Sequence, residues 1–297
     1  SEPNTLSKVE LSTGRMIEVM RGDRVVGALG RRAATLEAVG DFESVAEDLV
    51  LDLMTPGGLL GKITSQSSFL GPLPRLRYLG HVTVQGQPTN MNNYVGQLPV
   101  QELRVPVVLV VGTSMSAGKT ATARLLIRLL KQAGLRVAAA KLTGAARYRD
   151  ILSMQDAGAE HILDFVDVGL PSSICPREEY CSALQQLITR LSTMNVDVLV
   201  AEAGASPLEP YNGDAAIHLL GERVRLTALA ASDPYAVVGV MKAFELRPDM
   251  VTGLATNTSA GIRLIEKLSQ TLALNVLDQD CWPQVNQLLG QRLGLPS

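Results

Sequence analysis

The sequence predicts an α/β fold, in which a doubly wound, mostly parallel sheet covered by helices is preceded by a small β-rich domain. From residue 105 onward, apolar runs of strand length alternate regularly with amphipathic runs of helix length. Hydrophobic residues make up 46% of the chain and aromatic residues only 4%, a composition typical of parallel strands buried under helices. Before residue 100, short β-prone runs are separated by glycine-containing turns.

The alternation predicts each element of the α/β region in order. The apolar runs predict strands at 105–111, 135–141, 161–166, 196–203, 224–231, 250–255 and 273–277. The amphipathic runs between and after them predict helices at 119–133, 150–157, 177–194, 213–221, 234–244, 259–270 and 282–293. Because such sheets bind ligands beyond the carboxyl ends of their strands, functional residues are expected in the loops that follow strands.

The length of 297 residues favours two domains, which we place at 1–100 and 101–297. The first is predicted to be β-rich, with strand-like runs at 16–20, 25–29 and 78–84. The polar stretch 89–106, which contains two prolines, is predicted to link it to the second domain.

The charge balance argues against several classes of partner. Lys and Arg number 27 and Asp and Glu 29, so the net charge of −2 offers no general attraction for nucleic acid or an anionic membrane. The apolar run 105–111 is far shorter than the roughly 20 residues of a membrane span, and the polar start does not resemble a secretory signal. We therefore expect a cytoplasmic protein, with its three cysteines as reduced thiols.

The loop after the first predicted strand has the composition of a phosphate-binding loop. Small residues let the backbone surround phosphate oxygens, and the helix start directs free N–H groups at them. Lys119 adds a positive charge, and Thr120 offers a hydroxyl group to magnesium. The pattern differs from the usual GxxxxGK[ST], because the first glycine stands one residue earlier and Thr113 takes its place. The candidate phosphate-binding residues are Gly112, Thr113, Ser114, Met115, Ser116, Ala117, Gly118, Lys119 and Thr120.

Two other predicted strands end in charged residues. Glu202, at the end of 196–203, is a candidate magnesium ligand, and the alternative is a carboxylate that only caps the sheet edge. Lys141, at the end of 135–141, is a candidate catalytic residue, because an ammonium group there can stabilise a transferred phosphoryl group or an acidic substrate.

Further candidates lie in later loops. The amide of Asn257 can donate and accept hydrogen bonds, which suits the edge of a purine base, or it is a turn residue. Arg147 and Arg149 are either clamps for a carboxylate or phosphate group or ordinary loop charges. Asp150 is first a helix cap and second a magnesium or substrate ligand. Residues 211–214 are candidate substrate contacts.

The spacing of Gly112-Thr113 and Gly118-Lys119-Thr120 matches the GTxxxxGKT loop of dethiobiotin synthetase, so residues from about 100 onward resemble that branch of the P-loop proteins. The resemblance implies an ATP-binding P-loop fold, a magnesium-binding role for Glu202, a functional lysine at Lys141 and a base contact from Asn257. It also implies a homo-oligomer, because related P-loop enzymes usually work as dimers.

Three segments narrow the resemblance further. They are VGTSMSAGKT, KLTGAARYRDILSMQDAGAEHILDF and VAEAGASPLEPYNGDAAIHLLGER. Their order and content, over roughly 105–280, are similar to a bacterial and archaeal P-loop family of unknown function. Some members of that family are associated with N-acylation of acidic amino acids, so the resemblance keeps an acyltransferase among the alternatives.

Together these features predict a magnesium- and ATP-dependent P-loop enzyme that activates a small acidic substrate by phosphoryl transfer, as a kinase or a ligase. One alternative is an acyltransferase that holds the phosphates of coenzyme A in the same loop. Another is a non-enzymatic switch that presents its β-rich domain to a protein partner in response to nucleotide.

Overall fold

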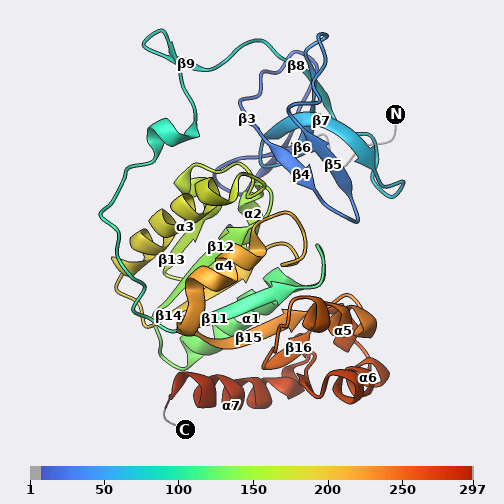
Figure 1. The fold of residues 1–297 in the computed structure, drawn as a ribbon, viewed down its shortest axis with the longest axis vertical. Coiled ribbons are helices and arrows are strands. Elements are labelled where there is room, and N and C mark those ends of the chain that lie inside the picture. The colour runs from blue at the N-terminus through green and yellow to red at the C-terminus, as the bar shows by residue number, and fades with distance from the viewer. Residues whose placement is uncertain (1–7, 296–297) are drawn as a thin grey trace.

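The computed structural model describes residues 8–295, which form a β-rich N-terminal part and a larger α/β part (Figure 1). Within these residues, the larger part is built on a seven-stranded sheet in the order β13-β12-β14-β11-β15-β16-β17, and its neighbouring strands pair in parallel. The predicted α/β fold is therefore confirmed. The strands are β11 (Val107–Gly112), β12 (Val137–Thr143), β13 (His161–Asp164), β14 (Val198–Ala203), β15 (Val224–Ala230), β16 (Met250–Thr252) and β17 (Leu272–Ala273).

Helices cover both faces of this sheet, because its strands are apolar on both sides. Val107 and Leu109 pack with α3 to α6, whereas Val108 and Val110 pack with α1, α2 and α7. This two-sided burial accounts for the unbroken apolar runs in the sequence. The helices are α1 (Lys119–Gln132), α2 (Tyr148–Asp156), α3 (Arg177–Ser192), α4 (Gly213–Leu220), α5 (Pro234–Ala243), α6 (Ser259–Ser269) and α7 (Trp282–Leu293).

Three strands end two or more residues earlier than predicted, each for a local reason. β13 ends at Asp164, whose carboxylate accepts the N–H of Val166 and turns the chain into the 3-10 helix η2 (Phe165–Val168). β16 ends before Gly253, whose φ of +91° departs from strand geometry. β17 pairs with the short strand β16 at two positions, Leu272 with Met250 and Ala273 with Val251, so it is no longer than its neighbour allows.

The N-terminal part is β-rich, as predicted, and mostly antiparallel. Its main sheet has the order β4-β5-β7-β6-β8, and β3 adds to β7 in parallel. The predicted strand 78–84 is wrong over most of its length, because only β9 at its end is a strand. The preceding strand β8 ends before residue 78, and Gly80 has a φ of +146°. The strands are β1 (Lys8–Glu10), β2 (Met16–Glu18), β3 (Ala28–Leu29), β4 (Arg31–Ala33), β5 (Ala38–Asp41), β6 (Val50–Thr55), β7 (Leu59–Gln66), β8 (Arg75–Arg77), β9 (Thr83–Val84) and β10 (Gln87–Pro88).

The N-terminal part lies on loops that follow the carboxyl ends of the parallel strands (Figure 1). A Cβ on Gly57, in the β6–β7 turn, would come within 2.5 Å of the carbonyl oxygen of Ala146, so the two backbones are in close contact there. Hydrogen bonds between the two parts join Ala33 N to Tyr211 Oη (2.9 Å), Thr35 Oγ1 to Glu209 Oε1 (2.7 Å) and Tyr148 N to Glu10 Oε2 (2.8 Å).

The predicted linker 89–106 returns along α3, where Gln186 Oε1 accepts the N–H of Leu98 at 2.9 Å. It contains the short 3-10 helix η1 (Met91–Tyr94). None of the helices within residues 8–295 combines the length and the apolar character of a membrane span.

Candidate functional site

The loop between β11 and α1 folds around its own lysine. Gly118, with a φ of +105°, precedes the first turn of α1, and Lys119 donates a hydrogen bond from Nζ to the carbonyl oxygen of Ser114 at 2.6 Å. A Cβ on Gly112 would lie 2.5 Å from Cδ of Lys119. The early glycine of the sequence pattern therefore makes room for the lysine side chain. Burial lowers the pKa of Lys119, and the Glu202 carboxylate opposes that effect.

Three neighbouring strands place charged side chains in one row beside this loop. Lys141 on β12 is the register partner of Glu202 on β14 and of Asp164 on β13. All three side chains are buried. Burial and the nearby Asp167 carboxylate raise the pKa of Asp164 to about 6. The structure thus brings together the two charged strand ends that the sequence singled out, Lys141 and Glu202.

Glu202 has one carboxylate oxygen in use and one free. Its Oε1 accepts a hydrogen bond from Thr120 Oγ1 at 3.3 Å, whereas Oε2 is buried and has no hydrogen-bond partner among the described residues. Burial raises the pKa of Glu202, although Lys141 opposes the rise. An unpartnered carboxylate oxygen beside a threonine hydroxyl matches the hard oxygen ligands that magnesium prefers.

No group of three or more His, Cys, Asp or Glu residues within 8–295 forms a metal site of its own. Magnesium is usually held by one or two carboxylates together with phosphate oxygens and water. The pair Thr120 and Glu202 fits that arrangement, in which a bound phosphate would complete the coordination.

Lys141 is held by an ion pair with Asp150, in which Nζ and Oδ2 lie 2.6 Å apart. Burial by itself lowers the pKa of Lys141, but the carboxylates of Asp150 and Glu202 outweigh it, so the pKa is raised. The expectation that Asp150 caps a helix is wrong: α2 begins two residues earlier, and the carboxylate of Glu10 accepts the N–H of Tyr148 at the helix start.

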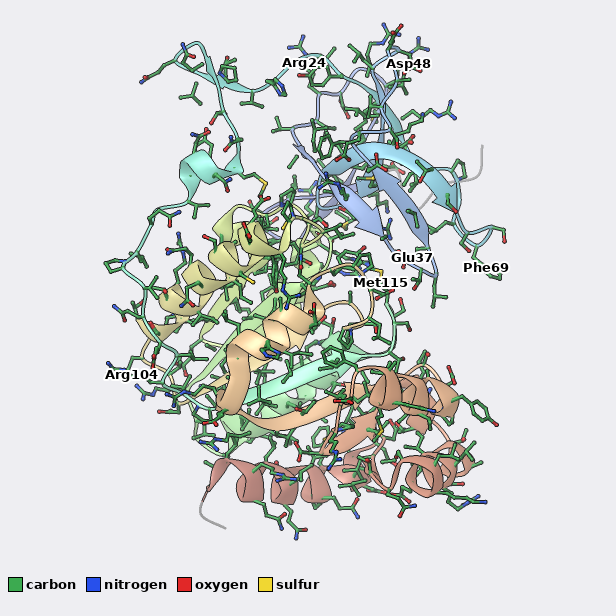
Figure 2. All side chains as sticks on the ribbon, viewed as in Figure 1. Arg24, Glu37, Asp48, Phe69, Arg104 and Met115 are labelled. Atoms are coloured by element: carbon green, nitrogen blue, oxygen red, sulfur yellow. The ribbon has the colours of Figure 1, made fainter. Side chains whose placement is uncertain are left out.

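A cleft of about 840 Å³ lies between the phosphate-binding loop and the N-terminal part. Both parts of the molecule line it, and Glu37 and Met115 mark its two sides in Figure 2. Its basic residues are Arg32, Lys119, Arg124, Lys141, Arg147 and Arg149, and its acidic residues are Glu37, Asp150, Asp156 and Glu202. Cationic groups are therefore in excess, which favours an anionic ligand.

The N-terminal part contributes residues to this cleft that were not expected from the sequence, among them Arg32 and Glu37. Arg32 on β4 is buried, and its guanidinium group pairs with Glu37 and donates to the carbonyl oxygen of Met54. No motif or spacing in the sequence distinguishes these residues from other surface charges of a small sheet.

Two candidates lie elsewhere. Asn257 is exposed at the end of the 3-10 helix η4 (Leu254–Thr256) and is not among the described residues that line the cleft. The predicted substrate role of 211–214 is wrong for its first residue, because Tyr211 is fully buried and its hydroxyl accepts the N–H of Ala33. Asn212 donates to the carbonyl oxygens of Ser173 and Cys175, so its side chain joins this loop to the segment that precedes α3.

Comparison with protein families identifies the larger part. Residues 94–276 match the model described as "Domain of unknown function (DUF1611_C) P-loop domain". The chain belongs to this family. The matched residues include the loop 112–120, Lys141, Glu202 and Asn257.

The fold is also similar to solved structures. A DUF1611 family protein from Anabaena variabilis is 16% identical, with 72% of this chain and 66% of that chain covered and a TM-score of 0.44. Chloroplast FtsY from Physcomitrella patens is 18% identical, with 62% of each chain covered and a TM-score of 0.41. The hydrogenase maturation factor HypB from Archaeoglobus fulgidus is 12% identical, with 64% and 90% covered and a TM-score of 0.43.

The chain spans about three fifths of the FtsY chains from Physcomitrella patens and Elizabethkingia anophelis that it matches, namely 62% and 60% of their lengths. A search of curated proteins found no match.

Proposed function

We propose that this protein binds a magnesium–ATP complex in its P-loop and transfers the terminal phosphoryl group to a small acidic substrate, as a kinase or a ligase. The observation that carries the proposal is the free Oε2 of Glu202, buried beside Thr120 and the two lysines Lys119 and Lys141. Such an oxygen is costly to bury without a partner, and a metal ion supplies one. The likeness of the loop spacing to dethiobiotin synthetase supports ATP as the nucleotide.

The residues around the loop have separate tasks in this proposal. The backbone N–H groups of 112–120 and the ammonium group of Lys119 bind the β- and γ-phosphates, for which Lys119 leaves the carbonyl oxygen of Ser114. Thr120 and Glu202 hold magnesium. When bound, the ion neutralises charge that builds up on the phosphate oxygens. Asn257 is assigned to the base of the nucleotide. It follows the end of β16, where Gly253 lies against the carbonyl oxygen of Ala117 in the phosphate-binding loop.

Lys141 and the cleft serve the acceptor. Asp150 and Glu202 keep Lys141 in its charged form although it is buried, so that it stabilises negative charge on the transferred group. Arg147 and Arg149 line the same cleft and bind the acidic group of the acceptor. Catalysis then depends on positioning and electrostatics, and no nucleophile from the protein is required.

Titration calorimetry with ATP and with GTP, each with and without magnesium, tests the nucleotide part of the proposal. Lys119→Ala is expected to weaken nucleotide binding both with and without magnesium. Glu202→Gln is expected to remove only the increase in nucleotide affinity that magnesium brings. Lys267→Ala, on the exposed side of α6, is the matched control and should bind as the wild type does. If Lys119→Ala leaves nucleotide affinity and turnover unchanged, the proposal is wrong.

The alternatives give different results in the same assays. Binding and consumption of acetyl-CoA in the presence of EDTA would favour an acyltransferase with coenzyme A phosphates in the loop. Nucleotide binding without any turnover, coupled to capture of a protein partner, would favour a switch.

A further inference from the structure

The two sides of the cleft differ in chemistry. The side formed by the P-loop part is basic, as described above. The side formed by the N-terminal part carries apolar side chains: Phe69 is 98% exposed and Leu36 is 61% exposed, with Leu70 and Leu73 half-buried beside them. Figure 2 shows Phe69 at the outer end of its loop. A cleft with one basic and one apolar side is suited to a ligand that has both characters.

The loop that carries Phe69 is held in one shape by hydrogen bonds. The N–H of Leu70 donates to the carbonyl oxygen of Ser67 at 3.1 Å, which closes a turn with Phe69 near its tip. The side chain of Gln66 donates to the carbonyl oxygens of Leu70 and Gly71, each at 2.8 Å. A phenylalanine on a braced turn has its backbone pre-organised for contact with a ligand, since little backbone flexibility is lost on binding.

The second apolar residue is tied to the same loop. The N–H of Ser67 donates to the carbonyl oxygen of Glu37 at 2.7 Å, which joins the β4–β5 turn containing Leu36 to the start of the Phe69 loop. Both apolar side chains therefore belong to one unit of the N-terminal sheet, and both line the cleft.

Arg147 on the opposite side has a guanidinium group with unused capacity. Its Nε is buried and has no hydrogen-bond partner among the described residues, and it lies 3.9 Å from Oδ1 of Asp150. The other oxygen of Asp150 is already bonded to Lys141. Because Nε itself is buried, an anionic group in the cleft would reach Arg147 through the exposed 42% of its side chain and not at Nε.

We propose that the acceptor joins an anionic group to an apolar body, with the anionic group bound by Arg147 and the apolar body covered by Phe69 and Leu36. This inference rests on the proposed function, because it names the class of acceptor for that reaction. A small, purely polar acid would leave both apolar side chains in water. An acceptor with an aromatic or branched aliphatic body removes that surface from water as it binds.

Calorimetry on the Mg–ADP complex, with 3-phenylpropionate and propionate as probes, tests the inference. The wild type is expected to bind 3-phenylpropionate more tightly than propionate. Phe69→Ala should weaken 3-phenylpropionate about 2- to 12-fold, the range for loss of one aromatic contact, and leave propionate unchanged. Phe69→Trp should restore the difference, and Arg147→Ala should weaken both acids. Phe42→Ala is the control, because Phe42 lies on the same part but outside the lining of the cleft.

The inference is overturned if the wild type binds the two acids equally or binds neither, or if Phe69→Ala keeps the wild-type ratio. Repeating the titrations without nucleotide separates it from the proposed function. A preference for 3-phenylpropionate that depends on Phe69 supports this class of ligand even where Lys119→Ala leaves nucleotide binding unchanged.

Discussion

The ion pair between Lys141 and Asp150 offers a direct test of how the site is built. Asp150→Asn keeps the size of the side chain and removes its charge, which leaves a buried ammonium group without its main partner. The side chain of Lys141 is 5% exposed and that of Asp150 22%, with Nζ and Oδ2 2.6 Å apart. Breaking a buried pair costs about 3–5 kcal/mol. Since Asp150 is partly exposed and Glu202 still faces Lys141, we expect a loss of about 3 kcal/mol, at the lower end of that range.

A second ion pair of nearly the same length provides the control. Arg177 and Asp214 are 2.5 Å apart, but their side chains are 57% and 43% exposed. Exposed pairs contribute about 0.2–1 kcal/mol, so Asp214→Asn should cost no more than that. The free energy of unfolding is measured for each variant by urea denaturation at pH 7, followed by circular dichroism.

A double variant separates the cost of an unpaired charge from general damage to the site. Adding Lys141→Met to Asp150→Asn removes the unpartnered ammonium group and should recover part of the lost stability, since Glu202 then loses a cation that opposes the effect of its burial. If Asp150→Asn and Asp214→Asn cost the same, or if the double variant is less stable than Asp150→Asn, the argument from buried charge is refuted.

Two further predictions concern groups outside the phosphate-binding loop. Glu10→Ala should lower the free energy of unfolding by about 1 kcal/mol, because Tyr148 N at the start of α2 loses its acceptor. Glu10→Gln retains an acceptor oxygen and should keep most of the wild-type stability. Equal losses for the two variants in urea denaturation would contradict this role. Asp164 has a folded pKa of about 6, above its ordinary value of 3.8, so the folded state retains a proton that the unfolded state releases. Wild-type stability should therefore fall by about 3 kcal/mol more than that of Asp164→Asn as the pH rises from about 4 to above 6, and parallel pH profiles of urea denaturation would contradict the assignment.

The order of the α/β elements could be predicted from the sequence because it depends on local patterns. Strands buried on both faces are apolar throughout, and helices covering them show an apolar stripe. The order of strands and helices in residues 105–293 can therefore be predicted from the apolar pattern alone. The strand ends were less predictable. Asp164 ends its strand through a side-chain hydrogen bond, and Gly253 ends its strand through a positive φ. Neither feature can be predicted from the periodicity of apolar residues.

The candidate site divides in the same way. The loop 112–120, Lys141 and Glu202 could be located from the sequence, because a phosphate-binding loop and strand-end charges are short, local features. The Lys141–Asp150 pair, the cap from Glu10 and the apolar side of the cleft at Phe69 were decided only by the tertiary structure. Each depends on how separate segments pack, and the packing of the N-terminal sheet on the strand-end loops leaves no periodic trace in the sequence.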